Sequence, residues 1–537
     1  MGIERPFYPI VYVRGFAATQ GEIEDTSADP FMGFNLGATK IRQNFEGHIL
    51  RFIFESPLLR LMKDEGYQDC FRDGDFLPAA ECADPRSIWI FRYYERASDS
   101  LGDGTRQAIP DIAQDLRRFI LRIRDSTCQK DAAKEKDFRV HLVAHSMGGL
   151  ICRCYLQNIC VYGTGNKIVD ATLELPTRAP FTPSDSIHLV DKVFTYATPH
   201  NGIDLAGFSA PNLGILDPFH VRNFNRVVIR DYLRLPAQSD GDDSVRSLNG
   251  AFPPDRFFCL IGSNYRDYDA FHKLSRRATG EMSDGLVMIK NAAVDGAPRA
   301  IVHRSHSGHF GIVNSEEGYQ NLRRFLFGDI RVEATLFADE ILLPTTLGER
   351  KAEADRTGKD FKLRASYQIE VTARVRGATY YMHERKVDHA SAILAPYDDF
   401  VKRKKPEYLF SGYLLKRAKT DTNDTALAFA VRVSIRVPMY EINERFWLDE
   451  HFEGGFVFDE TVTFFVRPRA NKTTIKFGLA SKIGIGEVET EAEAKQISDK
   501  LLRIEINLGF LPEEKNPPRP GFRGKLRLDC APWNRPT

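Results

Sequence analysis

The sequence lacks any apolar run long enough to span a membrane, and it lacks an excess of charge of either sign. No stretch approaches the roughly 18 consecutive apolar residues of a spanning helix. The 74 Lys and Arg residues balance 73 Asp and Glu residues, and no basic stripe gathers the positive charges, so nucleic acid is not an expected partner. With 42% hydrophobic and 27% charged residues, the composition is that of a soluble globular protein.

Cysteines are also few: the 537 residues contain eight, without the spacing of a disulfide framework. Cys152, Cys154 and Cys160 fall in an expected helix, where they suit small buried positions. We therefore expect reduced, structural cysteines, as in a reducing compartment.

The opening residues, "MGIERPFYPIVYVRGF", lack a charged region followed by a long apolar one, so no Sec signal is recognised. These features predict a cytoplasmic protein, with signal-independent secretion left open.

The pattern of apolar and polar residues changes near residue 328. Before it, apolar strand candidates alternate with helical periodicity, the pattern of an α/β domain with a mostly parallel sheet. The expected strands are residues 9–14, 87–94, 139–144, 192–197, 256–261 and 299–303. Helical periodicity marks residues 109–123, residues 44–62 with an interruption at Pro57, and residues 315–327 with Ser315 as the N-cap.

After residue 328, polar and apolar residues alternate with a period of two. The pattern predicts an antiparallel all-β domain over residues 329–537, most simply a sandwich. We expect Phe456, Phe458, Phe464 and Phe465 to lie in its core rather than to face lipid. Its role could be binding, docking to a membrane surface or oligomerisation, and the sequence does not rank these.

Ser146 lies in "RVHLVAHSMGGL", between an apolar run and a helical segment. The surrounding Ala144-His145-Ser146-Met147-Gly148 matches the G-x-S-x-G nucleophile elbow except for its first glycine. The elbow needs small residues two before and two after the serine, because a larger side chain would collide with neighbouring strands. Ala144 and Gly148 meet that need, so Ser146 is the expected nucleophile.

A serine nucleophile also needs hydrogen-bond donors for the oxyanion and a base for its proton. The early strand ends at Gly15, and we expect donors from the backbone of Phe16 or Ala17 and from the N–H of Met147. Gly15, together with His145 and His200, is assigned to the substrate-binding surroundings. His200, in "TPHNG", lies one strand too early to be the base.

Acid and base candidates follow later in the chain. Asp284, in "SDGLV", is the expected acid, with Asp267 and Asp269 as weaker alternatives. The base should precede the last helix, and "VHRSHSGHFGIVNS" offers His309 as the first choice and His306 as the alternative. The same histidines lack the partners of a zinc site, so neither a metal nor an organic cofactor is expected.

Four motifs in this order, "AHSMGG", "TPHNG", "SDGLV" and "HFGIVNS", resemble those of the α/β-hydrolase superfamily, in its bacterial lipase branch that includes the GPI inositol-deacylase-like proteins. The resemblance covers roughly residues 7–328 and implies an α/β-hydrolase domain over residues 1–328. Arg14 departs from it, because many lipases carry His before the oxyanion Gly. Residues 204–282 are long enough for a lid or cap, with Phe208, Leu213, Ile215, Leu216, Phe219 and Val221 as apolar candidates for an acyl site.

The resemblance and the Ser, Asp and His candidates predict a serine esterase or lipase that cleaves carboxylic esters through an acyl-enzyme. The expected partner is an ester or lipid substrate, with contact to a lipid surface as an additional option. Phospholipase, thioesterase, amidase and acyltransferase activities would use the same residues. A catalytically inactive hydrolase scaffold that binds a partner through its β domain is the alternative of another class.

Overall fold

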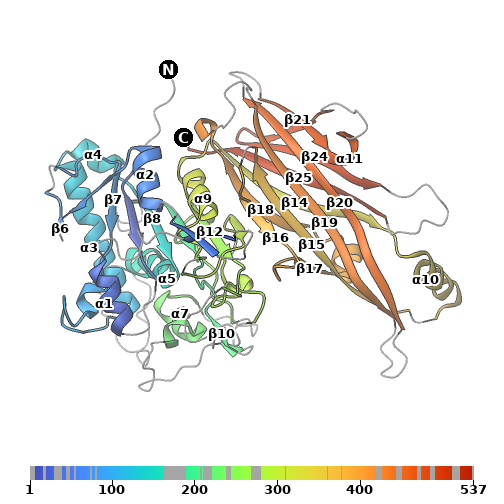
Figure 1. The fold of residues 1–537 in the computed structure, drawn as a ribbon, viewed down its shortest axis with the longest axis horizontal. Helices are drawn as coiled ribbons and strands as arrows, with labels where there is room; N and C mark the ends of the chain where they lie inside the picture. The colour runs from blue at the N-terminus through green and yellow to red at the C-terminus, as the bar shows by residue number, and fades with distance from the viewer. Residues whose placement is uncertain are drawn as a thin grey trace. The chain divides into compact units, whose positions relative to one another are not determined.

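The computed structural model divides the chain into two compact units, Met1–Arg299 with Arg304–Leu326, and Ala300–His303 with Phe327–Thr537 (Figure 1). It describes all residues except 1–6, 16–19, 30–38, 44–48, 54–55, 73–74, 79–80, 163–188, 206–207, 210–220, 237–242, 268–279, 309, 360, 377, 419–425, 443–449, 469–472, 484–489, 511–520 and 535–537.

A seven-stranded sheet with the order β13–β12–β9–β8–β1–β7–β4 organises the first part of the chain. Its strands are β1 (Ile10–Val13), β4 (Gln68–Asp69), β7 (Ser87–Ile90), β8 (Val140–His145), β9 (Val190–Tyr196), β12 (Phe257–Gly262) and β13 (Arg299–Val302). The pairs β4–β7, β7–β1, β1–β8, β8–β9 and β9–β12 are parallel. All six strands expected from apolar runs are present, and the α/β-hydrolase fold is confirmed.

Helices flank this sheet (Figure 1), and the longest is α3 (Ile109–Cys128), whose apolar stripe is buried. Helix α5 (Met147–Cys154) is buried along its whole length, and α9 (Glu316–Phe327) begins after Ser315, whose hydroxyl accepts from the Gly318 N–H at 3.0 Å. The other α-helices described before residue 328 are α1 (Gln20–Ala28), α2 (Pro57–Glu65), α4 (Ala132–Asp137), α6 (Cys160–Tyr162) and α7 (Arg226–Tyr232).

The prediction of one interrupted helix over residues 44–62 is wrong in its first half. Residues Ile49–Ile53 form strand β3, paired with β2 (Thr39–Gln43), and the helix begins only at Pro57. Proline suits the first turn of a helix, and it drives the preceding residue into extended backbone. Ser56 accordingly has φ −61° and ψ 157°, and it caps the helix by accepting from the Leu59 N–H. Pro57 therefore starts the helix rather than interrupting it.

The expectation of reduced cysteines is wrong for Cys70 and Cys82, which form a disulfide with Cα atoms 6.0 Å apart. A single pair of cysteines separated by 12 residues does not form the repeated spacing by which a disulfide framework is recognised in a sequence. The other six cysteines are free, and five of them are buried.

Because the disulfide restricts the unfolded chain, we expect that replacing Cys70 and Cys82 together by alanine lowers the free energy of unfolding by about 2–4 kcal/mol. The urea midpoint of tryptophan fluorescence measures this change. A reducing agent should lower the midpoint of the wild type and leave the double variant unchanged. An equal response of both proteins to the reducing agent would contradict the pairing.

The second unit contains two antiparallel sheets, with the orders β18–β14–β25–β24–β23 and β16–β15–β19–β20–β21–β22, and β17 pairs with β15. The strands are β14 (Ile330–Ile341), β15 (Leu363–Val375), β16 (His383–Arg385), β17 (Ile393–Pro396), β18 (Glu407–Leu414), β19 (Leu427–Ile442), β20 (Glu450–Pro468), β21 (Thr473–Leu479), β22 (Thr490–Glu491), β23 (Ala494–Ser498), β24 (Leu501–Phe510) and β25 (Phe522–Pro532). Helices α10 (Thr345–Thr357) and α11 (Ala480–Ile483) lie between strands.

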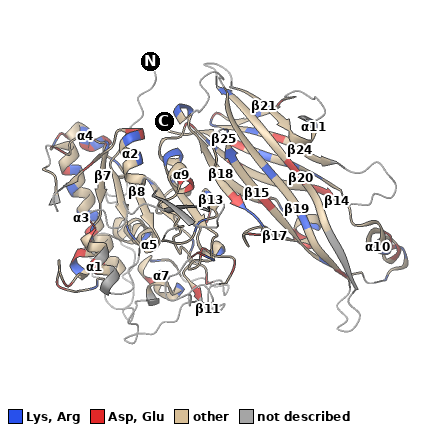
Figure 2. Cartoon of the chain, in the orientation of Figure 1, with Lys and Arg blue, Asp and Glu red and all other residues tan. Residues whose placement is uncertain are grey.

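One hydrophobic core joins residues of both sheets, as the period-two alternation predicts for a sandwich. The outward positions carry charges of both signs (Figure 2), with cross-strand ion pairs such as Arg432–Asp459 and Arg503–Asp529. Charged pairs on an outward face keep a sheet soluble at little cost in stability.

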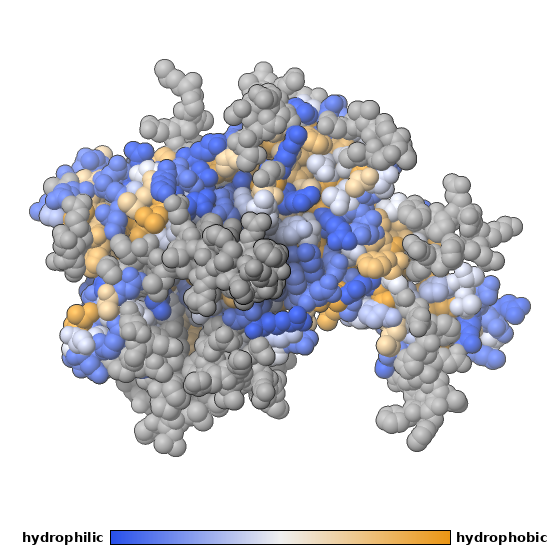
Figure 3. All heavy atoms as spheres, in the orientation of Figure 1, coloured by the Kyte–Doolittle hydropathy of each residue, from blue (hydrophilic) through white to orange (hydrophobic). Residues whose placement is uncertain are grey.

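The aromatic residues of β20 only partly follow the expectation of a core position. Phe458 and Phe464 are buried, but Phe456 is 55% exposed. Phe465, which alternates with buried Phe464 and Val466, is only half-buried. A β-bulge causes the exposure of Phe456, because Phe458 pairs with Ile435 and Phe456 with the next residue, Arg436. The extra residue Val457 shifts the alternation and leaves Phe456 exposed. The described part of the surface mixes hydrophilic and hydrophobic residues (Figure 3).

Among the described helices, none combines the length and the apolar composition that a membrane span requires.

Candidate active site at Ser146

Ser146 occupies a sharp turn between strand β8 and helix α5. Its backbone has φ 51° and ψ −125°, a region that residues other than glycine rarely adopt. The strand pairing continues into the turn, since the Ser146 N–H donates to the Tyr196 carbonyl at 2.9 Å. Such strain persists only where the surrounding structure enforces it, and it is often found at functional sites.

The glycines after Ser146 are required by close backbone contacts. A Cβ at Gly148 would lie 2.2 Å from the Val13 carbonyl oxygen, and one at Gly149 would lie 2.2 Å from the Thr198 hydroxyl. Ala144, two residues before the serine, is fully buried at the end of β8 and has room for its methyl group. The nucleophile elbow therefore tolerates an alanine two residues before Ser146, at position 144, but not two residues after it, at position 148.

His306 lies between Ser146 and Asp284. Its Nε2 is 2.9 Å from the Ser146 Oγ, and its Nδ1 is 2.9 Å from Asp284 Oδ2. All three side chains are almost fully buried, at 1–3% exposure. His309, the first choice from the sequence, lies outside the described residues, and the geometry favours His306, the alternative.

The hydrogen bonds of Asp284 determine how the imidazole is protonated. Asp284 Oδ1 accepts from the N–H groups of Leu286 at 3.0 Å and Val287 at 2.7 Å, which leaves Oδ2 for the histidine. A carboxylate only accepts, so Nδ1 of neutral His306 must carry the proton. Nε2 is then the acceptor that faces the Ser146 hydroxyl.

Backbone contacts fix the acid and the histidine relative to each other. The His306 N–H donates to the Asp284 carbonyl at 3.0 Å. Gly262, the last residue of β12, leaves room for this arrangement, because a Cβ there would lie 2.8 Å from Asp284 Cβ and 2.5 Å from the Arg304 carbonyl. The loops after β12 and β13 therefore meet at the carboxyl end of the sheet, where ligands bind in open α/β sheets.

His145 contacts the histidine loop rather than an open surface. Its Nε2 is 2.9 Å from the His306 carbonyl oxygen, to which it must donate, and the two rings are 5.1 Å apart. Burial, reinforced by nearby His306, lowers the pKa of His145 to about 3. A neutral His145 therefore holds the main chain of His306 in place throughout the physiological pH range.

Two of the three expected oxyanion donors cannot be placed, because Phe16 and Ala17 lie outside the described residues. Met147 is the first residue of α5, so its N–H is among those at a helix start without a partner within the helix. The turn before Phe16 is anchored by Tyr93, whose single hydroxyl hydrogen is shared between the carbonyls of Arg14 at 2.9 Å and Gly15 at 3.1 Å. Sequence reasoning missed Tyr93, since a tyrosine after a strand carries no pattern of its own.

Gly15 lies directly against the nucleophile, because a Cβ there would be 2.6 Å from Ser146 Cβ. We expect Gly15→Ala to displace the serine and to lower the rate of ester hydrolysis by about 100-fold. The matched control is Ala144→Gly, which removes a methyl group on the other side of the serine and should stay within a few-fold of wild type. Equal rates for Gly15→Ala and wild type would show that the turn tolerates a side chain.

His200 is fully buried, and its ring packs against Phe257 of β12. Its Nε2 lies 3.1 Å from the Thr195 hydroxyl, and its carbonyl accepts from the guanidinium of buried Arg153 at 2.8 Å. The same guanidinium binds the Val245 and Ser247 carbonyls and so ties α5 to that loop. These contacts describe a structural residue, and none places His200 against a substrate.

Burial, together with the charge of Arg153, lowers the pKa of His200 well below its ordinary value. The unfolded chain binds a proton at this residue below about pH 6.5, and the folded chain does not. The contribution of neutral His200 to the free energy of unfolding is therefore fully present above pH 6.5. As the pH decreases below 6.5, the free energy of unfolding decreases by up to about 1.4 kcal/mol per pH unit. Urea unfolding between pH 7.5 and 5 should show a flatter pH dependence for His200→Gln than for wild type, and parallel curves would contradict this account.

The lid and acyl-site interpretation falls largely outside the described residues. Leu213, Ile215, Leu216 and Phe219 lie outside the described residues, as do the side chains of Phe208 and Val221. The weaker acid candidate Asp269 lies outside them as well. Described parts of residues 204–282 include the short hairpin of β10 (Asp204–Leu205) and β11 (Phe208–Ser209), helix α7 and strand β12. Within the described chain, no group of three or more His, Cys, Asp or Glu side chains is arranged to hold a metal ion.

Neither a family model nor a curated protein matches the chain. Among solved structures, the lipase BlEst2 of Bacillus licheniformis in its propeptide form matches at 11% identity over 88% of this chain and 97% of that one, with a TM-score of 0.30. Phospholipase PlaB of Legionella pneumophila matches at 11% identity over 83% and 90%, with a TM-score of 0.29. The lin2722 product of Listeria innocua matches at 14% identity over 60% and 94%, with a TM-score of 0.24. These likenesses are too weak to carry a conclusion about activity.

Proposed function

We propose that the chain is a serine hydrolase that cleaves carboxylic esters. The observation that carries the proposal is the hydrogen-bonded series Ser146 Oγ, His306 Nε2, His306 Nδ1 and Asp284 Oδ2, with 2.9 Å at each contact between residues. A nucleophile, a base and an acid that orients the base form the arrangement that activates a serine. The strained backbone of Ser146 supports the same conclusion.

In the proposed mechanism, Ser146 Oγ attacks the ester carbonyl carbon while His306 Nε2 takes the hydroxyl proton. Asp284 stabilises the resulting imidazolium, and the Met147 N–H donates to the oxyanion. The protonated His306 then gives its proton to the leaving alcohol, which produces an acyl-enzyme on Ser146. A water that is deprotonated by His306 hydrolyses this intermediate and restores the serine.

The lipase-like motifs favour an apolar acyl group, and we propose a lipase or esterase of the bacterial lipase branch. A hydrolysis panel of p-nitrophenyl esters of increasing chain length, triglycerides, phospholipids, acyl-CoA and amides tests this proposal and ranks the alternative substrates. We expect turnover of at least one ester class by the wild type and none by Ser146→Ala. Turnover that persists in Ser146→Ala would remove the serine from the mechanism.

A further inference from the structure

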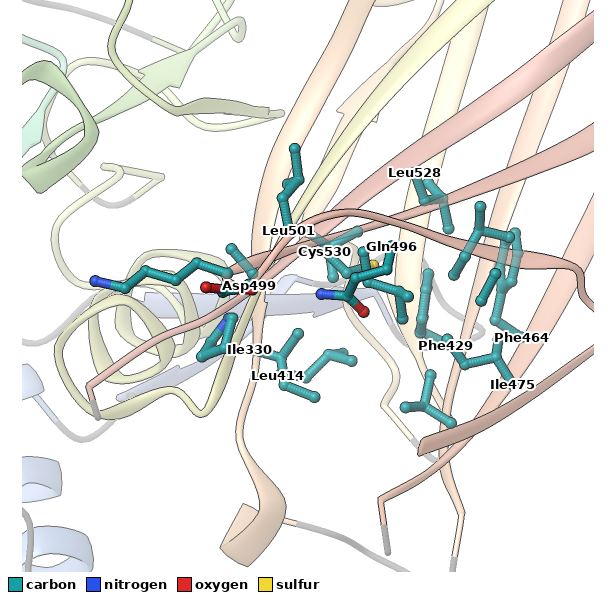
Figure 4. A pocket seen from close by; sticks show the side chains of 18 residues that line it. Ile330, Leu414, Phe429, Phe464, Ile475, Gln496, Asp499, Leu501, Leu528 and Cys530 are labelled. Atoms are coloured by element: carbon teal, nitrogen blue, oxygen red, sulfur yellow. The ribbon is translucent and has the colours of Figure 1, made fainter. Parts of the chain in front are cut away.

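A cavity of about 410 Å³ lies between the two sheets of the second unit (Figure 4). The five-stranded sheet contributes Val332, Ile504 and Leu528 to its walls, and the other sheet contributes Phe429, Phe464 and Ile475. All of its lining residues belong to the second unit. The cavity therefore shares no residue with the site around Ser146, and a ligand could bind in it whether or not the chain is a hydrolase.

The size of this cavity sets it apart from ordinary packing. Protein interiors are close-packed, with few voids larger than a water molecule. Sites for small ligands, in contrast, measure about 300–1,000 Å³ and are lined mainly by apolar side chains. The sandwich cavity has that size and that lining, and apolar cavities of this kind take up apolar molecules rather than water.

The polar side chains of the lining gather at one end. Gln496 lies in strand β23, and Asp499 and Lys500 form its turn to β24; all three side chains are exposed (Figure 4). The Gln496 amide nitrogen donates to the Ser498 carbonyl, next to the turn. The walls contributed by the other strands carry no charged group among the described lining residues. A phosphate or a sugar would lose its hydrogen bonds to water there without replacement.

The geometry points to a single-chain lipid, such as a long-chain fatty acid, whose unbranched aliphatic chain lies between the sheets and whose polar end lies at the β23–β24 turn. Packed sheets are about 10 Å apart, so a space between them is thin enough for one extended chain. Asp499 and Lys500 carry opposite charges next to each other, so the entrance offers no net charge. We therefore infer that the aliphatic chain, rather than the charge of the head group, determines binding.

Photocrosslinking of the full-length wild-type chain tests this inference. A palmitic acid that carries a diazirine in its chain is irradiated with the protein, and the attachment sites are mapped by mass spectrometry. We expect saturable attachment to residues of β20, β24 or β25, with competition by palmitic acid and, within a few-fold, by hexadecanol. Attachment confined to the surroundings of Ser146, or no saturable attachment, would overturn the inference.

A matched pair of variants tests the location. Ala494 and Lys495 are neighbours on the exposed edge strand β23, and only Ala494 lines the cavity. Ala494 pairs with Ile504, which also lines the cavity, so we expect Ala494→Trp to occupy part of the cavity and to weaken binding of the photoreactive fatty acid by about tenfold or more. Lys495→Trp places the same side chain on the opposite face and should bind as the wild type does. If both variants bound the photoreactive fatty acid with the same affinity, whether unchanged or weakened, the fatty acid would bind elsewhere.

Discussion

His306→Ala is expected to lower kcat/KM for ester hydrolysis by about 10⁴-fold or more, whereas His309→Ala should stay within a few-fold of wild type. The imidazole of His306 is the described group that contacts both the Ser146 hydroxyl and the Asp284 carboxylate. Without it, the serine has no base in hydrogen-bond reach, and only the oxyanion donors and substrate binding still accelerate the reaction. Hydrolysis of a short p-nitrophenyl ester measures the effect.

His309→Ala serves as the matched control, because the two histidines lie three residues apart in the same loop. Circular dichroism of both variants establishes that the fold is retained. If His309→Ala abolished hydrolysis and His306→Ala left it near wild type, the base would be His309, and the contacts of His306 would be structural.

Asp284→Asn is expected to lower kcat by about 10⁴-fold with little change in stability. Asp284 Oδ1 accepts two backbone N–H groups, so an asparagine at this position would keep its carbonyl oxygen there and turn its NH₂ group toward His306. Nδ1 would then accept a hydrogen bond from this NH₂ group, so the ring proton would sit on Nε2, which could no longer take a proton from Ser146. The imidazole would be held in the wrong tautomer for taking a proton.

Asp267→Asn is the appropriate control for Asp284→Asn, because Asp267 was a weaker acid candidate and accepts from the Asn264 side chain rather than from a histidine. It should leave kcat unchanged. A small effect of Asp284→Asn, within about tenfold, would mean that the carboxylate does not orient the base.

The positions of six strands of the parallel sheet and of Ser146 were predictable because local patterns specify them. Continuous apolar runs marked the buried parallel strands, and the small residues around Ser146 reflected the sharp turn that the backbone now shows. The choice between His306 and His309 was not predictable, because it depends on the path of a loop after β13. The supporting roles of Tyr93 and His145 were missed for the same reason, since they arise from contacts between segments far apart in the sequence.

Other differences between prediction and structure have equally local causes. Residues 49–53 carry a helix-compatible pattern, yet they pair with residues 39–43, and hydrophobic periodicity does not report such a partner. Phe456 is exposed because one extra residue in β20 shifts the alternation. A β-bulge has no sequence signature here that would distinguish Phe456 from buried Phe458.

Reaction with a fluorophosphonate tests the central claim most directly, because the reagent attaches only to an activated serine. The folded wild-type chain should gain one phosphonyl group, located on Ser146 by peptide mass spectrometry, and Ser146→Ala and His306→Ala should gain none. An unmodified wild-type protein with its fold intact would contradict the account and would leave an inactive hydrolase scaffold. Attachment to a different serine would move the active site away from the elbow.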